Sequence, residues 1–199
     1  MTLTLWNIHL CFALAIFLLL PLRSRSRIVQ GGVLLGLLAL GFVPVQGLPL
    51  VAYPRALAPE VSIVTLLALC WIVLVRMRLV QPLPGRQRCT LLALFGGLGL
   101  VLYPAALGLG AFDPYQWGFG PQAMLLALGL LALSMLYLGH WLAVSMLTLA
   151  TMAFGLGLLE SENYWDYLLD PFVVIYCWFA LLAAGIRQLW ALRSRPLAG

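Results

Sequence analysis

The stretch QAMLLALGLLALSMLYLGHWLAVSMLTLATMAFGLGL, residues 122–158, decides the fold, because it contains no Asp, Glu, Lys or Arg. A single helix over this stretch would be about 55 Å long, nearly twice the thickness of a bilayer core of about 30 Å. Two shorter helices joined by a tight turn at 138–141 fit that thickness. Gly139 suits the end of a helix and Trp141 suits a membrane interface, so the stretch predicts a helical hairpin.

The composition of the whole chain places it in the same class. Hydrophobic residues make up 64% of the chain and charged residues 9%, against about 45–50% and about 25% in soluble domains. A chain of 199 residues with this composition predicts an integral membrane protein without a sizeable soluble domain. The net charge of +5 comes from arginines that lie beside apolar runs, so lipids are expected partners and nucleic acid is not.

Apolar runs elsewhere in the chain extend the pattern. We expect one transmembrane domain, residues 1–199, formed by an all-α polytopic bundle of about seven transmembrane helices. The expected helices cover residues 3–22, 28–47, 58–76, 90–110, 122–138, 141–158 and 170–190. The first run is expected to remain as a helix, because its positive charges follow the run, whereas a signal peptide carries them before it.

The charged residues test this topology. With seven spans, ten arginines fall on one side, namely Arg23, Arg25, Arg27, Arg76, Arg78, Arg86, Arg88, Arg187, Arg193 and Arg195. Arg55 and all six acids, Glu60, Asp113, Glu160, Glu162, Asp166 and Asp170, fall on the other. The positive-inside rule makes the arginine side cytoplasmic, which puts the N-terminus outside and the C-terminus in the cytoplasm. The absence of lysine is typical of a GC-rich bacterial genome, so we expect the bacterial inner membrane.

The segment ESENYWDYLLDP, residues 160–171, concentrates acids and aromatic rings in one outer loop. We take a candidate outer surface from this segment and from the two outer loops before it. Its residues are Glu160, Glu162, Tyr164, Trp165, Asp166, Asp113, Trp117 and Arg55. Three interpretations stay open. The acids form a solvated loop, or they dock a basic partner or a divalent cation, or two of them act as a catalytic pair.

Asp170 has a structural interpretation of its own. It stands directly before Pro171, and proline is favoured at the first position of a helix. An aspartate there accepts backbone N–H groups and faces the positive end of the helix. We therefore expect a cap, which asparagine would replace almost without loss.

Inside the apolar runs, polar groups are sparse. Asn7 and His9 in the first run are the intramembrane candidates, since a polar residue in a membrane is a functional hypothesis by default. The four cysteines form no CxxC pair, and no metal or cofactor motif is present, so no cofactor and no metal are expected.

These features favour a non-enzymatic subunit or accessory protein of a bacterial envelope complex. Its acidic and aromatic outer surface would meet another membrane or periplasmic protein, or a lipid or glycan headgroup. One alternative is an integral membrane enzyme that acts on a lipid-linked substrate at the outer face. The other is a channel or carrier for an uncharged or lipidic solute, although the chain has no acid or base at mid-membrane of the kind that ion-coupled carriers use.

Overall fold

The computed structural model describes residues 6–57, 60–109 and 113–193, and within them the fold is all-helical. The seven longer helices are α1 (Trp6–Leu19), α2 (Arg27–Leu40), α4 (Ile63–Arg76), α5 (Gly85–Ala106), α6 (Gln122–Tyr137), α7 (Trp141–Gly155) and α9 (Pro171–Arg193). The short elements are α3 (Ala52–Leu57), the 3-10 helix η2 (Pro114–Gly118), α8 (Tyr164–Leu168) and a hairpin of β1 (Pro44–Val45) and β2 (Leu48–Pro49).

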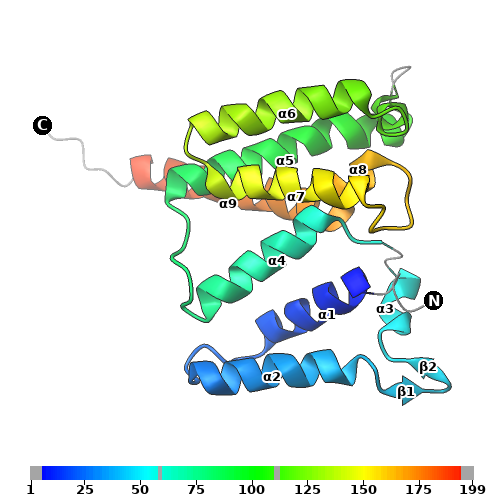
Figure 1. Ribbon diagram of the computed structural model, residues 1–199. Coiled ribbons are helices and arrows are strands. Elements are labelled where there is room, and N and C mark those ends of the chain that lie inside the picture. The colour runs from blue at the N-terminus through cyan, green and yellow to red at the C-terminus, as the bar shows by residue number, and fades with distance from the viewer. Residues whose placement is uncertain (1–5, 58–59, 110–112, 194–199) are drawn as a thin grey trace, which may run out of the picture.

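Helix α4 joins two parts of the bundle. In Figure 1, α1 and α2 lie together on one side, α5, α6, α7 and α9 lie on the other, and α4 crosses between them. Each part has its own buried core. Leu66 and Val73 of α4 pack with α1, whereas Ile63 and Val64 pack with α5, α7 and α9. A single helix thus connects both cores.

Glycines allow α5 and α9 to pack closely. A methyl group on Gly99 would collide with Val174, and one on Gly96 would lie 3.3 Å from the Trp178 ring. The Trp178 indole N–H donates to the Gly96 carbonyl at 3.0 Å. Small residues bring helices together in this way in membrane bundles.

The uncharged stretch 122–158 folds back on itself at the expected place. Helix α6 ends at Tyr137 and α7 begins at Trp141. Gly139 between them has a φ of 73°, which glycine adopts without strain. The His140 N–H donates to the Met135 carbonyl at 2.8 Å and closes the turn.

The second helix is shorter than the sequence predicted. The run 28–47 was expected to be one helix, but α2 ends at Leu40 and a hairpin follows. Gln46 and Gly47 have φ values of 49° and 83°, the pair of positive angles that a tight hairpin turn requires. Pro44 also lacks the N–H that a helix would need. The expected starts at residues 3 and 58, the expected end at 110, and Arg195 lie outside the described residues.

Within the described ranges, two helices are long and apolar enough to cross a membrane, α5 and residues 171–191 of α9. The other apolar helices, α1, α2, α4, α6 and α7, have 14 to 16 residues. A helix that crosses the hydrocarbon core alone needs about 20 residues.

Candidate functional site

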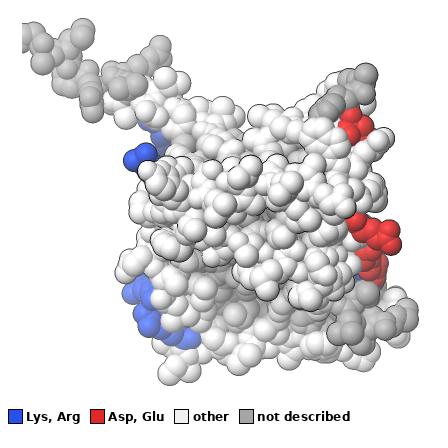
Figure 2. All heavy atoms as spheres, turned by 45° about the horizontal axis from the view of Figure 1, so that its top comes forward, with Lys and Arg blue, Asp and Glu red and all other residues white. Residues whose placement is uncertain are grey.

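The charged side chains gather at two opposite ends of the bundle. Figure 2 shows arginines on one side of the face in view and carboxylates on the other. We call the second the acidic end, and its described acids are Glu60, Asp113, Glu160, Glu162, Asp166 and Asp170. We call the first the arginine end; Arg55 lies at the acidic end, where it pairs with Glu160.

The acidic end is organised around Asn163, which is fully buried. Its side-chain oxygen accepts the Trp165 N–H at 2.9 Å and so caps α8. Its amide donates to the Tyr115 carbonyl of η2 at 2.9 Å, and its own backbone N–H donates to the Ser161 hydroxyl at 3.0 Å. Asn163 therefore fastens the outer loop before α6 to the loop before α9.

Asp166 strengthens the same connection. Its Oδ2 accepts hydrogen bonds from the Tyr115 hydroxyl at 2.9 Å and from the Ser161 hydroxyl at 2.5 Å. Burial, and to a smaller extent the hydrogen bond to the Asp166 carboxylate, raise the pKa of Tyr115 to about 12. The phenol consequently stays a proton donor at neutral pH, and Asp166 acts as an acceptor between two loops.

Asp170 joins the starts of two helices. Its Oδ1 accepts the Val173 N–H of α9 at 2.9 Å, which is the position expected of an N-cap. Its Oδ2 accepts the Ser62 N–H directly before α4 at 2.8 Å. Because Asp170 and Ser62 are both buried, the carboxylate satisfies a backbone donor that water reaches poorly.

Glu60 and the pair of Arg55 and Glu160 hold the loop that follows α7. Glu60 Oε1 accepts the Glu160 and Ser161 N–H groups at 2.8 and 3.2 Å. Burial raises the pKa of the Glu60 carboxyl, although those two hydrogen bonds oppose the rise. Arg55 of α3 pairs with Glu160 at 2.6 Å in a partly exposed position.

The acids spaced by four do not share one helix face. Glu162 precedes α8, Asp166 lies in α8, and Asp170 precedes α9. Glu162 is exposed, and no hydrogen bond or ion pair of its side chain is found within the described part of the chain. Glu162 is thus the acid of this segment most available to a partner.

Two aromatic residues of the candidate outer surface are not at the surface. Tyr164 is fully buried and Trp165 nearly so, because both rings pack into the main core and both hydrogen-bond inside it. The Trp165 indole N–H donates to the Pro114 carbonyl at 2.8 Å, and the Tyr164 hydroxyl contacts the Thr151 hydroxyl. Trp117, in contrast, is 52% exposed.

Asp113 caps η2 from the other outer loop. Its Oδ1 accepts the Tyr115 N–H at 3.0 Å, and its side chain is exposed. The structure therefore brings the loops before α6 and α9 together. Two selected residues, Asp166 and Trp165, make contacts between them, but so do Tyr115 and Asn163, with Ser161 bonded to both Asp166 and Asn163, and the sequence analysis did not select these three. Asn163 before a short aromatic helix was the one local signal, since asparagine is a preferred N-cap.

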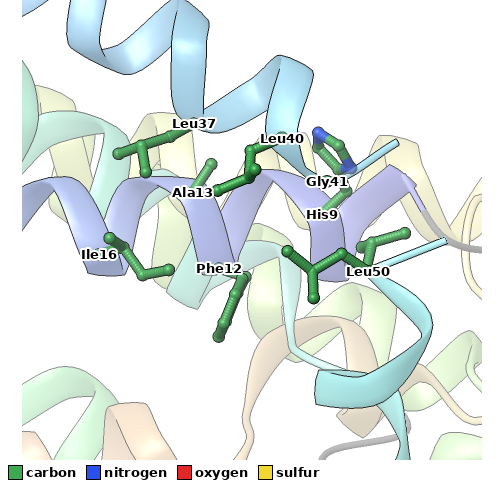
Figure 3. A pocket seen from close by; sticks show the side chains of 9 residues that line it. His9, Phe12, Ala13, Ile16, Leu37, Leu40, Gly41 and Leu50 are labelled. Atoms are coloured by element: carbon green, nitrogen blue, oxygen red, sulfur yellow. The ribbon is translucent and has the colours of Figure 1, made fainter. Parts of the chain in front are cut away.

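Asn7 and His9 lie in α1, and Asn7 contacts the same Val61–Ser62 peptide group that Asp170 binds. The Asn7 amide donates to the Val61 carbonyl, and Asn7 Oδ1 accepts the Cys11 thiol at 3.6 Å. His9 stacks on Phe42 with ring centroids 4.6 Å apart. In Figure 3, His9 and Gly41 lie at one end of a small cavity of about 40 Å³. Such a cavity has room for water but not for a cofactor.

Among the described residues, no three His, Cys, Asp or Glu side chains lie close enough to hold a metal ion together. No known protein family, curated protein or solved structure matches this chain.

Proposed function

We propose that this chain is a multi-pass protein of the bacterial inner membrane with seven spans, an external N-terminus and a cytoplasmic C-terminus. In this proposal it serves as a non-enzymatic subunit or accessory protein of an envelope complex, and its acidic end meets a basic membrane or periplasmic partner. The observation that carries the proposal is the separation of charged side chains to two ends, with an uncharged face between them in Figure 2 and many large apolar side chains exposed on the helices.

The apolar sides support a lipid environment. Leu126 and Leu130 of α6 are 72% and 66% exposed. Other large apolar side chains are exposed on α2, α6 and α9, namely Ile28, Leu133, Phe179, Leu182 and Trp190. Monomeric soluble proteins rarely expose so many large apolar side chains on neighbouring turns of a helix.

The short helices fit this environment through their flanks. Helices α1 and α2 cover about 21 Å each at the helical rise, less than a bilayer core of about 30 Å. Leu20 and Leu22 extend the apolar length after α1, and Phe42 and Val43 extend it after α2. A bilayer also thins around short spans at a cost of fractions of a kcal/mol per Å.

The acidic end suits recognition because most of its polar groups are already fixed. Asn163, Asp166 and Asp170 hold the two outer loops in one arrangement, so a partner would meet a preformed surface. On that surface Glu162 carries the exposed charge, with Asp113 and Trp117 in the neighbouring loop. A basic patch would complement it and would bind more weakly as salt rises.

Reporter fusions test the topology. Fusions after residues 25, 82 and 197 should report a cytoplasmic position, and fusions after residues 54, 115 and 164 an external one. Two inverted results would overturn the seven-span arrangement.

Co-purification in mild detergent tests the recognition role. The Glu162→Gln variant should accumulate normally and lose its co-purifying protein. The Gln116→Ala variant, which changes an exposed uncharged residue in η2, should retain it. Equal recovery of the partner with both variants would assign the acidic end a purely structural role.

A further inference from the structure

A cleft opens at the arginine end, away from the acidic surface. It has a volume of about 300 Å³ and lies between α4, α5, α7 and α9. Its walls include Trp71, Val75, Leu83, Arg88, Met146 and Tyr176. We call it the Arg88 cleft, because Arg88 is the one charged side chain among the described residues that line it. A volume of this size lies at the lower limit of small-molecule pockets, which are mostly apolar with a few polar groups.

Arg88 carries a charge that nothing in the described ranges neutralises. Its side chain is exposed, and the one ion pair found there joins Arg55 to Glu160. Arg76 at the same end is different, because its guanidinium donates to the carbonyls of Phe17 and Leu18. The Arg88 guanidinium therefore remains available to an anion from outside the chain.

The start of α5 adds to this positive potential. Arg86 and Arg88 lie in its first turn, which contains no acid, and Pro84 before it provides no side-chain cap. A helix N-terminus carries about half a positive charge and favours anions. The two guanidinium groups repel each other, and the positive end of the helix dipole repels both. A bound phosphate would reduce this repulsion.

The rest of the cleft wall is mostly apolar. Trp71 and Val75 come from α4, and Met146 comes from α7. Tyr176 belongs to α9, which begins at the acidic end, so the cleft reaches from the arginine end toward the middle of the bundle. A soluble anion would leave this apolar wall empty, whereas an acyl chain would cover it.

We propose that the Arg88 cleft binds one anionic phospholipid of the cytoplasmic leaflet. The phosphate lies on the Arg88 guanidinium, which can donate two parallel hydrogen bonds, and an acyl chain lies against Trp71 and Met146. This inference rests on the proposed membrane placement of the chain. Anionic lipids are attracted to basic groups at the cytoplasmic surface, and the cleft adds a position for one of them.

The test is a lipid titration of the full chain in neutral detergent, read by native mass spectrometry. Phosphatidylglycerol should be retained in preference to phosphatidylcholine. Arg88→Gln should weaken phosphatidylglycerol retention by about tenfold, because a charge-assisted contact is lost. Arg86→Gln removes the same charge two residues away, outside the cleft wall, and should weaken it by less than about twofold. Ile72→Trp, which fills the cleft from a partly exposed position, should weaken retention of both lipids.

Three outcomes would overturn the inference. Equal losses for Arg88→Gln and Arg86→Gln would show attraction to general surface charge. No loss with Ile72→Trp would show that the cleft holds no acyl chain. Displacement of phosphatidylglycerol by millimolar inorganic phosphate would show a soluble-anion site. A wrong topology can be distinguished from a wrong lipid site. If the topology is wrong, fusions after residue 82 report an external position, whatever the lipid titration shows.

Discussion

At the acidic end, the carboxylates of Glu60, Asp166 and Asp170 accept hydrogen bonds from backbone N–H groups or hydroxyls of other segments. At the arginine end, Arg86 and Arg88 are exposed and have no described carboxylate beside them. The difference follows partly from helix polarity. Carboxylates match the N–H groups at helix starts, as Asp170 does before α9, whereas α5 starts among arginines. Carboxylates thus hold the acidic end together, whereas Arg86 and Arg88 remain available to anions.

Asp170→Ala should cause the largest loss of stability. The substitution removes hydrogen bonds to the Ser62 and Val173 N–H groups and leaves buried donors unpaired, which costs about 3–4 kcal/mol. Unfolding in mild detergent measures it. Asp170→Asn should lose about half as much, because one amide oxygen cannot replace both carboxylate oxygens. A silent Asp170→Asn variant would show that the cap alone matters and that the bond to Ser62 contributes nothing.

Arg76→Ala should lower the free energy of unfolding by less than Asp170→Ala does, and would show that an arginine also stabilises the fold. Its guanidinium donates to carbonyls of Phe17, Leu18 and Leu20 near the end of α1 and lies 5.3 Å from the centre of the Phe17 ring. Loss of these contacts should cost about 2 kcal/mol, since water can reach part of the site.

The exposed Arg23→Ala variant is the matched control, and its free energy of unfolding should stay within about 0.5 kcal/mol of the wild type. If Arg76→Ala were equally silent in the same detergent unfolding measurement, the contacts of Arg76 with the end of α1 would contribute nothing to stability.

Gly118→Ala should disturb the acidic end by steric means alone. An added methyl group would collide with the Asn163 side chain, which is fully buried and held by hydrogen bonds. Overpacking of this kind should lower the free energy of unfolding by about 1–2 kcal/mol. Gly120→Ala in the same loop meets no atom within 4 Å and should be neutral. Equal stability of the two variants would mean that η2 can move away from α8 freely.

Local patterns in the sequence predicted the features that local physics determines. The turn at 138–141 followed from helix length and Gly139, and the position of Asp170 followed from the proline after it. The hairpin at 44–49 was missed because its apolar residues resembled a helix, although Gln46–Gly47 and Pro44 carried a turn signal. The contacts of Ser62 with Asp170 and of Tyr115 with Asp166 join segments far apart in the chain. Such contacts depend on how the helices pack against one another, and the spacing of apolar residues within one segment does not determine that packing.

The smallest expected effect concerns the pH dependence of stability at the acidic end. Burial raises the pKa of Glu60, and the nearby carboxylates of Asp166 and Glu160 raise it further, against two backbone hydrogen bonds that lower it. The folded chain therefore binds this proton more tightly than the unfolded chain. The resulting contribution to stability is complete below the ordinary glutamate pKa of about 4.3 and is lost as pH rises through the higher folded value.

Glu60→Gln isolates this contribution, because glutamine keeps an acceptor oxygen for the Glu160 and Ser161 N–H groups but does not titrate. The free energy of unfolding should be measured from about pH 4 to about pH 7 for both proteins. The difference between them removes the titration of acids that do not interact with Glu60. Relative to the variant, the wild type should lose stability as pH rises, by a fraction of a kcal/mol since Glu60 is partly exposed. A wild type that instead gains stability with pH would show that the two backbone hydrogen bonds outweigh burial, and the acidic end would then be held together by charge as well as by shape.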